Sequence, residues 1–512
     1  MPKGVALADT AISLRDYYAC VDYMKYEIVS PLTLPDSARK SHVVVFGGTR
    51  TGKTRLMMQD IRYAVPRGWN LIIMDPKMEQ NKSALFSVLV EAAKKAGRED
   101  DLLFIDITNP DNSARFNPFE VFNHPRQIVK HMLNIMPEKK GEAEFYKNVA
   151  DRVLWWAIDS YFRLCESEGK TPQVTLSQLR KITSWDEMQK TFAIIDDLAK
   201  FDPSWEDLRI RGDQIVNGSE RKDFEKIIYD LHNVFNAIGT GTIGQIIDVE
   251  NGTEIYDRIY NSRGLLLYIY TGSLILGEDA VMLSKLFMSG IKILSGLTST
   301  SRPSGRLDTP CIIYIDECHE VLFPGFEKLL TMAGGINFWL YLATQSVSNF
   351  DVVLGENLRH VYMDNIGTQV FLNCKNSEIT GKYVSAKIGQ MNLGEVWKNT
   401  AEMGEGGTYK EKQKTLVDSG FIGRIAARKF LAFIRGEDYE RVWIGRVTDV
   451  PDPSMIVTDM PSIGRQVFHK GEPDGIGENP NRTCNFNQEK RQHSQLAAIP
   501  PQNHLRVACS GG

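Results

Sequence analysis

The sequence lacks the features that would place it in an oxidising compartment or across a membrane. No segment reaches the ~18 consecutive apolar residues of a membrane-spanning helix, and the first forty residues contain neither the basic start nor the apolar core of a secretory signal. The seven cysteines include no C-x-x-C pair, as expected for a reduced chain. We therefore expect a cytoplasmic protein without a transmembrane segment, and we leave open a peripheral position at a membrane.

The net charge and the length show that the chain is neither a strongly basic protein nor a single compact core. A formal net charge of −4 gives no overall basic signature, so any nucleic-acid partner must meet a local patch. A chain of 512 residues is too long for one compact core, so two or three folding units are expected. The 42% hydrophobic and 24% charged residues are ordinary for a globular protein.

The most informative stretch is VVVFGGTRTGKTRLMMQD, residues 43–60, which contains the spacing G-x-x-x-x-G-K-T of a Walker A motif. In this motif the backbone N–H groups of a tight glycine-rich loop meet phosphate oxygens at the start of a helix. Lys53 is predicted to reach the β- and γ-phosphates of ATP, and Thr54 to ligate Mg²⁺. The predicted nucleotide-binding residues are Gly47, Gly48, Thr49, Arg50, Thr51, Gly52, Lys53, Thr54 and Arg55.

Short apolar runs that end in polar residues predict the strands of a parallel sheet. They lie at Asn70–Asp75, Asp101–Asp106, Gly264–Tyr270, Cys311–Asp316, Phe338–Thr344 and Thr368–Asn373. Helical stretches lie between several of them, including residues 83–96 and 278–295. This alternation predicts an α/β fold, a mostly parallel sheet with helices on both faces.

Composition changes suggest the organisation of the rest of the chain. We expect a lead-in segment with a short helix over residues 1–40, a first nucleotide-binding part over 41–124, an all-helical insertion over 125–236, a second nucleotide-binding part over 237–460 and a disordered tail over 461–512. Within the second part, residues 298–309 are a predicted linker. Residues 404–418 are a predicted exposed loop and residues 430–446 a predicted hairpin.

Asp316 and Glu317 follow the apolar run Cys311–Ile315, which is the Walker B arrangement of two carboxylates at the end of a buried strand. Asp316 is predicted to hold Mg²⁺, and Glu317 to orient and deprotonate the attacking water. Gln345 ends the following strand and is predicted to sense the γ-phosphate or the water. The alternative for Asp316 and Glu317 is that they are two surface acids at the end of a strand. The alternative for Gln345 is a solvated strand end. Cys318 and His319 lack further ligands at metal-site spacing, so no metal site is predicted there.

These motifs, together with Asp75-Pro76-Lys77 and Phe116-Asn117-Pro118-Phe119, occur in an order that resembles the TraD/TraG family of type IV secretion coupling proteins. The likeness spans residues 41–449. It implies a RecA-like P-loop ATPase, a homo-hexameric ring that uses ATP and Mg²⁺ and moves DNA through its channel. The implied partners are single- or double-stranded DNA, a relaxase, the type IV secretion channel ATPases and inner-membrane components.

The sequence departs from the family pattern at two points. The turn Met332–Asn337 lacks the arginine that many relatives carry there, so Arg359, Arg302 and Arg306 are candidates for an arginine supplied to a neighbouring site, with Arg359 preferred. A plain surface arginine is the alternative. The N-terminal membrane helices of most relatives are also missing from this sequence, so the expected location is the cytoplasm, with peripheral docking at the inner membrane left open.

DNA contact requires cationic or hydrogen-bonding groups along the channel. The candidates are residues 239–244, residues 302–306 and the lysines from Lys410 to Lys414. The helical insertion is a candidate for cargo choice, with a packing role as its alternative. Three other functions stay open: a secretion ATPase for protein substrates, a DNA translocase related to FtsK and HerA, and a non-enzymatic nucleotide-binding scaffold.

Overall fold

The computed structural model describes residues 4–13, 28–29, 32–77, 83–122, 124–136, 143–218, 221–323, 325–398, 407–415, 417–436 and 440–448. All of them belong to the first of the two units into which the chain divides, Met1–Gly471. The predictions for residues 14–27 and for the tail 461–512 lie outside the described residues.

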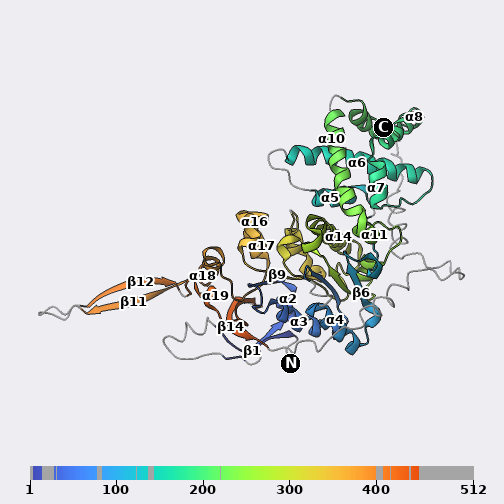
Figure 1. Cartoon of the computed structure of the whole chain (residues 1–512). Coiled ribbons are helices and arrows are strands. Elements are labelled where there is room, and N and C mark those ends of the chain that lie inside the picture. Colours follow the sequence, from blue (N-terminus) through green and yellow to red (C-terminus); the bar gives the residue numbers. More distant parts are fainter. Residues whose placement is uncertain are drawn as a thin grey trace, which may run out of the picture. The chain divides into compact units, whose positions relative to one another are not determined.

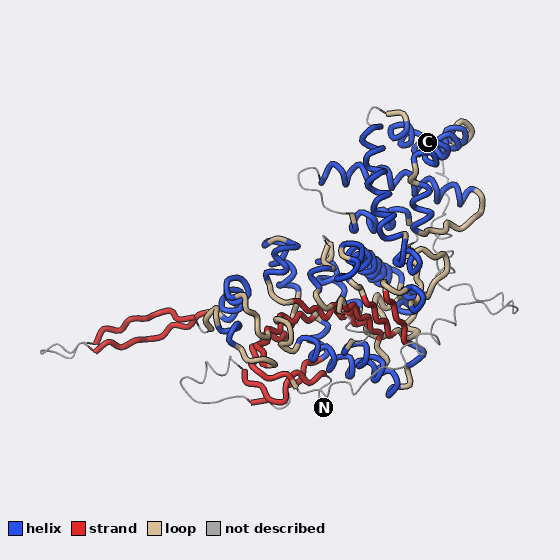
Figure 2. Tube along the Cα trace, in the orientation of Figure 1, coloured by secondary structure: helices blue, strands red, loops and turns tan. Residues whose placement is uncertain are grey.

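A sheet with seven adjacent parallel strands forms the centre of the molecule (Figures 1 and 2). In spatial order these strands are β10 (Thr368–Phe371), β4 (Val43–Phe46), β9 (Phe338–Thr344), β8 (Cys311–Ile315), β5 (Asn70–Asp75), β7 (Leu266–Tyr270) and β6 (Leu102–Asp106). Nearly all of their residues are buried, which explains why each is a continuous apolar run. The predicted α/β fold with a mostly parallel sheet is confirmed.

Helices cover both faces of this sheet (Figure 1). One face carries α3 (Lys53–Ala64) and α4 (Ala84–Ala96), and the other carries α14 (Glu278–Ser301), α16 (Ser348–Leu354) and α17 (Glu356–Asn365). The shorter helices are α2 (Asp36–Lys40), α12 (Ile255–Tyr260), α13 (Ser273–Leu276), α15 (Glu327–Met332), α18 (Lys382–Ile388) and α19 (Phe421–Arg424). Because α14 runs to Ser301, the predicted linker 298–309 is helical at its start.

Helix α14 is also the one described helix that is long and apolar enough to pass as a membrane span. Its most apolar 18-residue window has a mean hydropathy of 1.4, and 61% of that window is buried inside the protein. It packs against helix α5 (Pro125–Ile135), where Asn134 donates a hydrogen bond to Ser289. The core helix of a globular protein has the same properties.

Antiparallel strands extend the sheet beyond β10. β13 (Lys429–Arg435) and β14 (Glu440–Val447) form the predicted hairpin, and β1 (Gly4–Ser13) pairs with β14. β1 also pairs with β2 (Ile28–Val29) and β3 (Leu32–Pro35). The interpretation of residues 1–40 as a lead-in segment was therefore wrong. Those residues supply strands of the main sheet, because the edge of β14 offers unpaired backbone groups to β1.

A buried charge cluster joins the N-terminal part to the P-loop helix. Arg39, on α2, donates a 2.6 Å hydrogen bond from Nη2 to Oδ2 of Asp60 on α3, and the hydroxyl of Tyr314 donates to the same oxygen at 2.5 Å. The Arg39 guanidinium lies within 5.0 Å of the ring centres of Tyr63 and Trp69. These contacts pair two opposite charges inside the core, although Oδ1 of Asp60 has no hydrogen-bond partner among the described residues.

The described residues between 125 and 247 form helices joined by short connections, without a strand. The helices are α5, α6 (Ala143–Ser167), α7 (Leu176–Ile182), α8 (Trp185–Ala199), α9 (Glu206–Val216), α10 (Arg221–Gly239) and α11 (Gly241–Ile247). Trp156 is fully buried between them and donates a 2.9 Å hydrogen bond to the carbonyl of Leu208. The predicted DNA-contact segment 239–244 spans the end of α10 and the first residues of α11, whose Ile243 and Ile246 are buried.

The predicted loop 404–418 is also corrected in part. Residues Gly407–Thr415 form β12, which pairs antiparallel with β11 (Gln390–Lys398) in a separate two-stranded ribbon (Figure 1). Nine consecutive residue pairs are in register, from Gln390 with Thr415 to Lys398 with Gly407. The glycine- and lysine-rich composition suggested a loop, but pairing with the more apolar β11 makes it a strand.

Candidate nucleotide site

The Walker A loop lies between β4 and α3 and is tied to both strands that flank β4. The N–H of Gly47 donates to the carbonyl of Thr344 at 3.1 Å, and the N–H of Gly48 donates to the carbonyl of Asn373 at 2.9 Å. A Cβ at Gly47 would lie 2.5 Å from Oγ1 of Thr51, so only glycine fits there. Gly52 begins the helix at φ +123°, a conformation that other residues rarely adopt.

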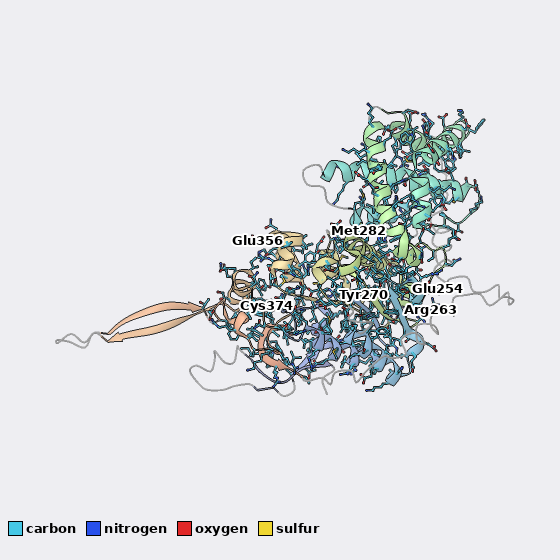
Figure 3. All side chains as sticks on the ribbon, in the orientation of Figure 1. Glu254, Arg263, Tyr270, Met282, Glu356 and Cys374 are labelled. Atoms are coloured by element: carbon cyan, nitrogen blue, oxygen red, sulfur yellow. The ribbon has the colours of Figure 1, made fainter. Side chains whose placement is uncertain are left out.

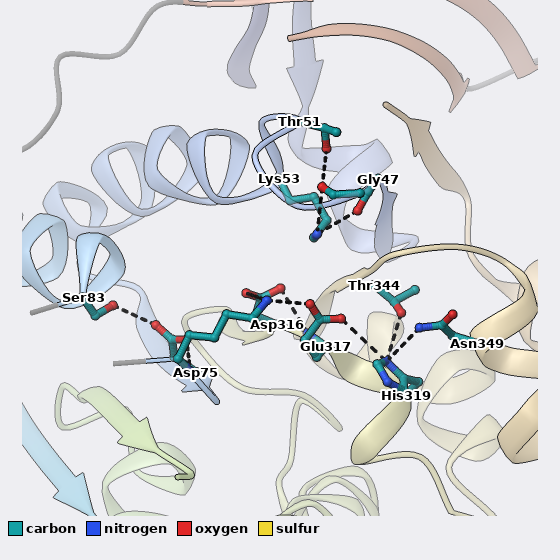
Figure 4. A network of polar contacts seen from close by, with 12 residues as sticks. Gly47, Thr51, Lys53, Asp75, Ser83, Asp316, Glu317, His319, Thr344 and Asn349 are labelled. Atoms are coloured by element: carbon teal, nitrogen blue, oxygen red, sulfur yellow. Dashed lines mark hydrogen bonds and ion pairs between the residues drawn. The ribbon is translucent and has the colours of Figure 1, made fainter. Parts of the chain in front are cut away.

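Lys53 is buried with its ammonium group inside this loop (Figure 4). Its Nζ donates to the carbonyls of Gly47 at 2.7 Å and Gly48 at 3.4 Å. Thr51 donates from Oγ1 to the Gly48 carbonyl at 2.8 Å and stiffens the loop. Thr54, the predicted Mg²⁺ ligand, lies half-buried in the first turn of α3, while Thr49 and Arg50 are exposed and Arg55 is half-buried.

Three carboxylates meet where β5 and β8 end. Met74 and Ile315 are partners in the parallel pairing of these strands, so Asp75 and Asp316 follow at the same edge, with Glu317 next in the chain. All three are buried. Figure 4 shows Lys53 facing the Asp316–Glu317 pair. The Walker A lysine and the Walker B carboxylates therefore lie together at the carboxyl ends of the strands, where α/β sheets bind ligands.

The three carboxylates differ in their protonation behaviour. Burial raises the pKa of Asp75 to about 6, although hydrogen bonds from the Lys77 N–H and Ser83 oppose the rise. Burial also raises the pKa of Asp316, and the positive charges of Lys77 and Lys53 offset part of this rise. Burial acts in the same direction on Glu317, but the Lys77 hydrogen bond and the two lysine charges together lower its pKa below the usual value. Glu317 is thus held as a carboxylate.

Lys77 belongs to the site, although in the sequence it stands out only as part of a motif. Its Nζ lies 2.6 Å from Oε1 of Glu317 and 3.8 Å from Oδ2 of Asp316. The turn that carries it is fixed by Asp75, whose Oδ1 accepts the Lys77 N–H at 2.9 Å. Only the adjacency of β5 and β8 brings the two motifs together, and the sequence does not state that adjacency.

His319 is a second residue of the site that was not predicted from the sequence, since this histidine was considered there only as a metal ligand. Its Nδ1 lies 3.0 Å from Oγ1 of Thr344, at the end of β9, and 3.8 Å from Oε2 of Glu317. Asn349, at the start of α16, lies 3.5 Å from the same nitrogen (Figure 4). These contacts connect the Walker B end to the segment after β9. Gln345 itself is exposed just beyond that strand, and its predicted sensing role stays a prediction.

The candidate arginines have different environments. Arg359, on α17, is 8% exposed and pairs at 3.2 Å with Asp351 and with Glu356, which is labelled in Figure 3. Arg302 pairs with Asp308 at 2.5 Å, and Arg306 is exposed. In this conformation Arg359 is engaged within its own chain. A role at a neighbouring subunit's site would require it to leave these carboxylates, and that role stays a prediction.

Comparisons with known proteins agree with this geometry. The family model described as type IV secretory system conjugative DNA transfer matches residues 25–205, and the model described as the TraM recognition site of TraD and TraG matches residues 310–423. Together these matches span more than half of the chain. Comparison with the curated protein sequences finds no match.

Solved structures of a bacterial conjugative coupling protein, TrwB, have a similar fold. The unbound form lacking 70 residues has 15% sequence identity and a TM-score of 0.55, covering 83% of this chain and 89% of that one. The complex of TrwB with the ATP analogue ADPNP has 14% identity and a TM-score of 0.57, covering 89% and 98%. The complex with ADP and Mg²⁺ has 14% identity and a TM-score of 0.53, covering 83% and 88%.

At this low identity the structural matches support the fold alone. The two family models match the sequence segments that contain the Walker A loop and the Walker B strand. The chain belongs to the TraD/TraG family of type IV secretion coupling proteins, the family of conjugative DNA transfer.

Proposed function

We propose that this chain binds ATP with Mg²⁺ and hydrolyses it to drive the transfer of a relaxase-bound DNA strand in conjugation. The observation that carries the proposal is that Lys53 faces Asp316 and Glu317 at one edge of the sheet. A phosphate-binding loop and an ionised carboxylate at the carboxyl ends of neighbouring strands are the two parts that nucleotide hydrolysis requires.

The residues present fit this cofactor. The loop around Gly47 has no room for a side chain, so its backbone can approach phosphate oxygens closely. Lys53 and the loop N–H groups would hold the triphosphate, and Thr54 and Asp316 would hold Mg²⁺. The metal neutralises phosphate charge when it is bound. The structures of TrwB with ADP and Mg²⁺ and with an ATP analogue support the same cofactors.

Glu317 supplies the base. Its carboxylate is buried and ionised, and one of its oxygens, Oε2, has no hydrogen-bond partner in the described part of the chain. Since no donor occupies that oxygen, it is the one that would orient a water in the site and accept its proton. Gln345 is the proposed sensor beside it, because it follows the strand that separates β4 from β8.

The proposed partners follow from the family. They are DNA in the channel of a homo-hexameric ring, a relaxase, the ATPases of the secretion channel and components of the inner membrane, with the chain in the cytoplasm or at the inner face of that membrane. Arg359 is the proposed arginine that acts on a neighbour's nucleotide. The helical insertion, residues 125–236, is the proposed site of cargo choice.

The test is ATP turnover of the full chain with and without single- and double-stranded DNA. We expect DNA to stimulate phosphate release severalfold, because a translocating motor couples hydrolysis to its polymer. Heparin serves as the control, since it is a polyanion without bases. Turnover that ignores DNA would favour a protein-secreting motor, and nucleotide binding without any turnover would favour the scaffold.

The β11–β12 ribbon is the proposed DNA contact. Lys410, Lys412 and Lys414 occupy alternate positions of β12, so the strand geometry places them on one face of the ribbon. An isolated two-stranded ribbon is at best marginally stable in water, so a partner that covers this face would stabilise it.

Replacing these three lysines with glutamate is expected to weaken DNA binding by more than about tenfold. The slope of log affinity against log salt should fall by about one for each phosphate that the variant no longer neutralises. Fluorescence anisotropy of labelled DNA over a salt series measures both quantities. The control reverses Lys40, Lys94 and Lys95, which are exposed on α2 and α4. An unchanged salt slope in the ribbon variant would contradict the assignment.

A further inference from the structure

We propose that Lys77 is a positioning residue for hydrolysis, holding Glu317 by Oε1 so that Oε2 alone is presented to the attacking water. This inference rests on the proposed function and names a residue through which the same site works. Four features of the site support it: the contact itself, the oxygen without a donor, the anchoring of Lys77 and the local charge.

The contact is short and one-sided. Nζ of Lys77 lies 2.6 Å from Oε1 of Glu317, within charge-assisted hydrogen-bond distance, but 3.8 Å from Oδ2 of Asp316. The Glu317 side chain is 6% exposed, whereas the Lys77 side chain is 48% exposed. Lys77 therefore reaches from an exposed position to a buried carboxylate. Asp316 accepts the N–H of Glu317 with Oδ1 at 3.1 Å, and its Oδ2 lies too far from Lys77 for a hydrogen bond.

The other oxygen of Glu317 has no donor. Oε2 is buried and has no hydrogen-bond partner among the described residues, and Nδ1 of His319 lies 3.8 Å from it. A buried carboxylate oxygen left without a donor is costly, so a water that enters the site is favoured there. Because Lys77 engages Oε1 and no donor engages Oε2, Oε2 is the oxygen that can take a water in one orientation.

Lys77 is itself anchored, unlike an ordinary surface lysine. Its N–H donates to Oδ1 of Asp75, and Oδ2 of Asp75 accepts from Ser83 at 2.7 Å and from Tyr268 at 2.8 Å. Asp75 thus joins the end of β5, the start of α4 and strand β7 behind the turn that carries Lys77. Exposed ion pairs usually contribute little to stability because both side chains move. Here the Glu317 carboxylate is buried and the backbone of Lys77 is fixed.

The charges near Glu317 require a cation. Asp75, Asp316 and Glu317 lie together at the ends of β5 and β8, and the positive charges that act on Glu317 include those of Lys77 and Lys53. Lys53 is committed to the loop carbonyls. Glu317 also has a left-handed backbone, at φ +47°, which a residue other than glycine keeps only when its surroundings fix it. The Lys77 side chain, which is half exposed, holds the Glu317 carboxylate from the solvent side.

The experiment compares Lys77→Met, Lys77→Arg and the control Lys95→Met. Lys95 makes a 2.6 Å ion pair with Glu91 on the surface of α4, so its variant removes an ion pair of the same length outside the site. We expect Lys77→Met to lower kcat on the order of 10²-fold, because a misplaced base loses most of its contribution. KM and the affinity for a fluorescent ATP analogue should stay within about twofold, since binding is the task of the P-loop.

Lys77→Arg should recover kcat to within about tenfold of the wild type, and Lys95→Met should be unchanged. Thermal unfolding of each variant separates loss of fold from loss of position. An unchanged kcat in Lys77→Met overturns the inference, as does an equal loss in kcat and nucleotide affinity or a folded Lys77→Arg no better than Lys77→Met.

The wild type and Lys53→Ala are measured in the same series. If the wild type turns over no ATP, the proposed function fails, and a crystal structure of Lys77→Met then decides the inference. A Glu317 side chain that keeps its place without Lys77 overturns the inference, and one that turns away supports it.

Discussion

Glu317→Gln is expected to lower ATP turnover by roughly 10²- to 10⁴-fold while nucleotide affinity stays close to that of the wild type. The glutamine amide has nearly the same size but cannot accept a proton from water. It also loses the charge that attracts Lys77, whose Nζ lies 2.6 Å from Oε1. The nucleotide-binding loop is left intact, because Gly47 and Gly48 are held by backbone hydrogen bonds to Thr344 and Asn373.

The matched comparison is Lys53→Ala, which removes the ammonium inside the loop. That variant should lose nucleotide affinity as well as turnover, so the two substitutions separate binding from hydrolysis. Glu168→Gln, on the surface of the helical region, controls for the loss of one carboxylate. Phosphate release and titration with a fluorescent ATP analogue measure the two quantities. A Glu317→Gln protein with wild-type turnover would remove Glu317 from the role of base.

Arg39→Met is expected to lower the free energy of unfolding by about 3–5 kcal/mol. Methionine keeps most of the side-chain volume against Tyr63 and Trp69 but leaves Asp60 buried without its cation, with the Tyr314 hydroxyl as its remaining described donor. A buried unpaired carboxylate is far less favourable than an exposed one. Urea unfolding followed by tryptophan fluorescence measures the change.

Adding Asp60→Asn to Arg39→Met provides the control. Asparagine is uncharged and still offers an oxygen to Tyr314, so the double variant should regain at least about 1 kcal/mol over the single one. If the double variant is no more stable than Arg39→Met, the loss came from packing against the rings and the charge argument is wrong.

Much of the nucleotide site could be predicted because its parts are local in sequence. The Walker A loop needs glycine at fixed positions between a strand and a helix, and β4 and β8 are apolar runs that end at the functional residues. Parallel strands buried on both faces leave this pattern in any sequence. The same reasoning predicted the parallel strands and the β13–β14 hairpin.

What could not be predicted depends on pairing between distant residues. β1 was missed because a short mixed sequence becomes a strand only beside β14, where Ala11 lies opposite Gly445. β12 was interpreted as a loop because its lysines and glycine disfavour strands, and its pairing with β11 overrides that preference. The roles of Lys77 and His319 depend on the order of β5, β8 and β9 in the sheet, so the sequence did not predict them.

The position of β4 in the sheet has a consequence for synthesis of the chain. Val43 lies beside Tyr341 on one side and Thr368 on the other, so both neighbours of the P-loop strand come from some 300 residues later. A growing polypeptide therefore leaves the ribosome with its phosphate loop unsupported until residue 371 has been made. ATP can assist the folding of the finished protein by mass action, but it has no completed pocket to bind on the nascent one.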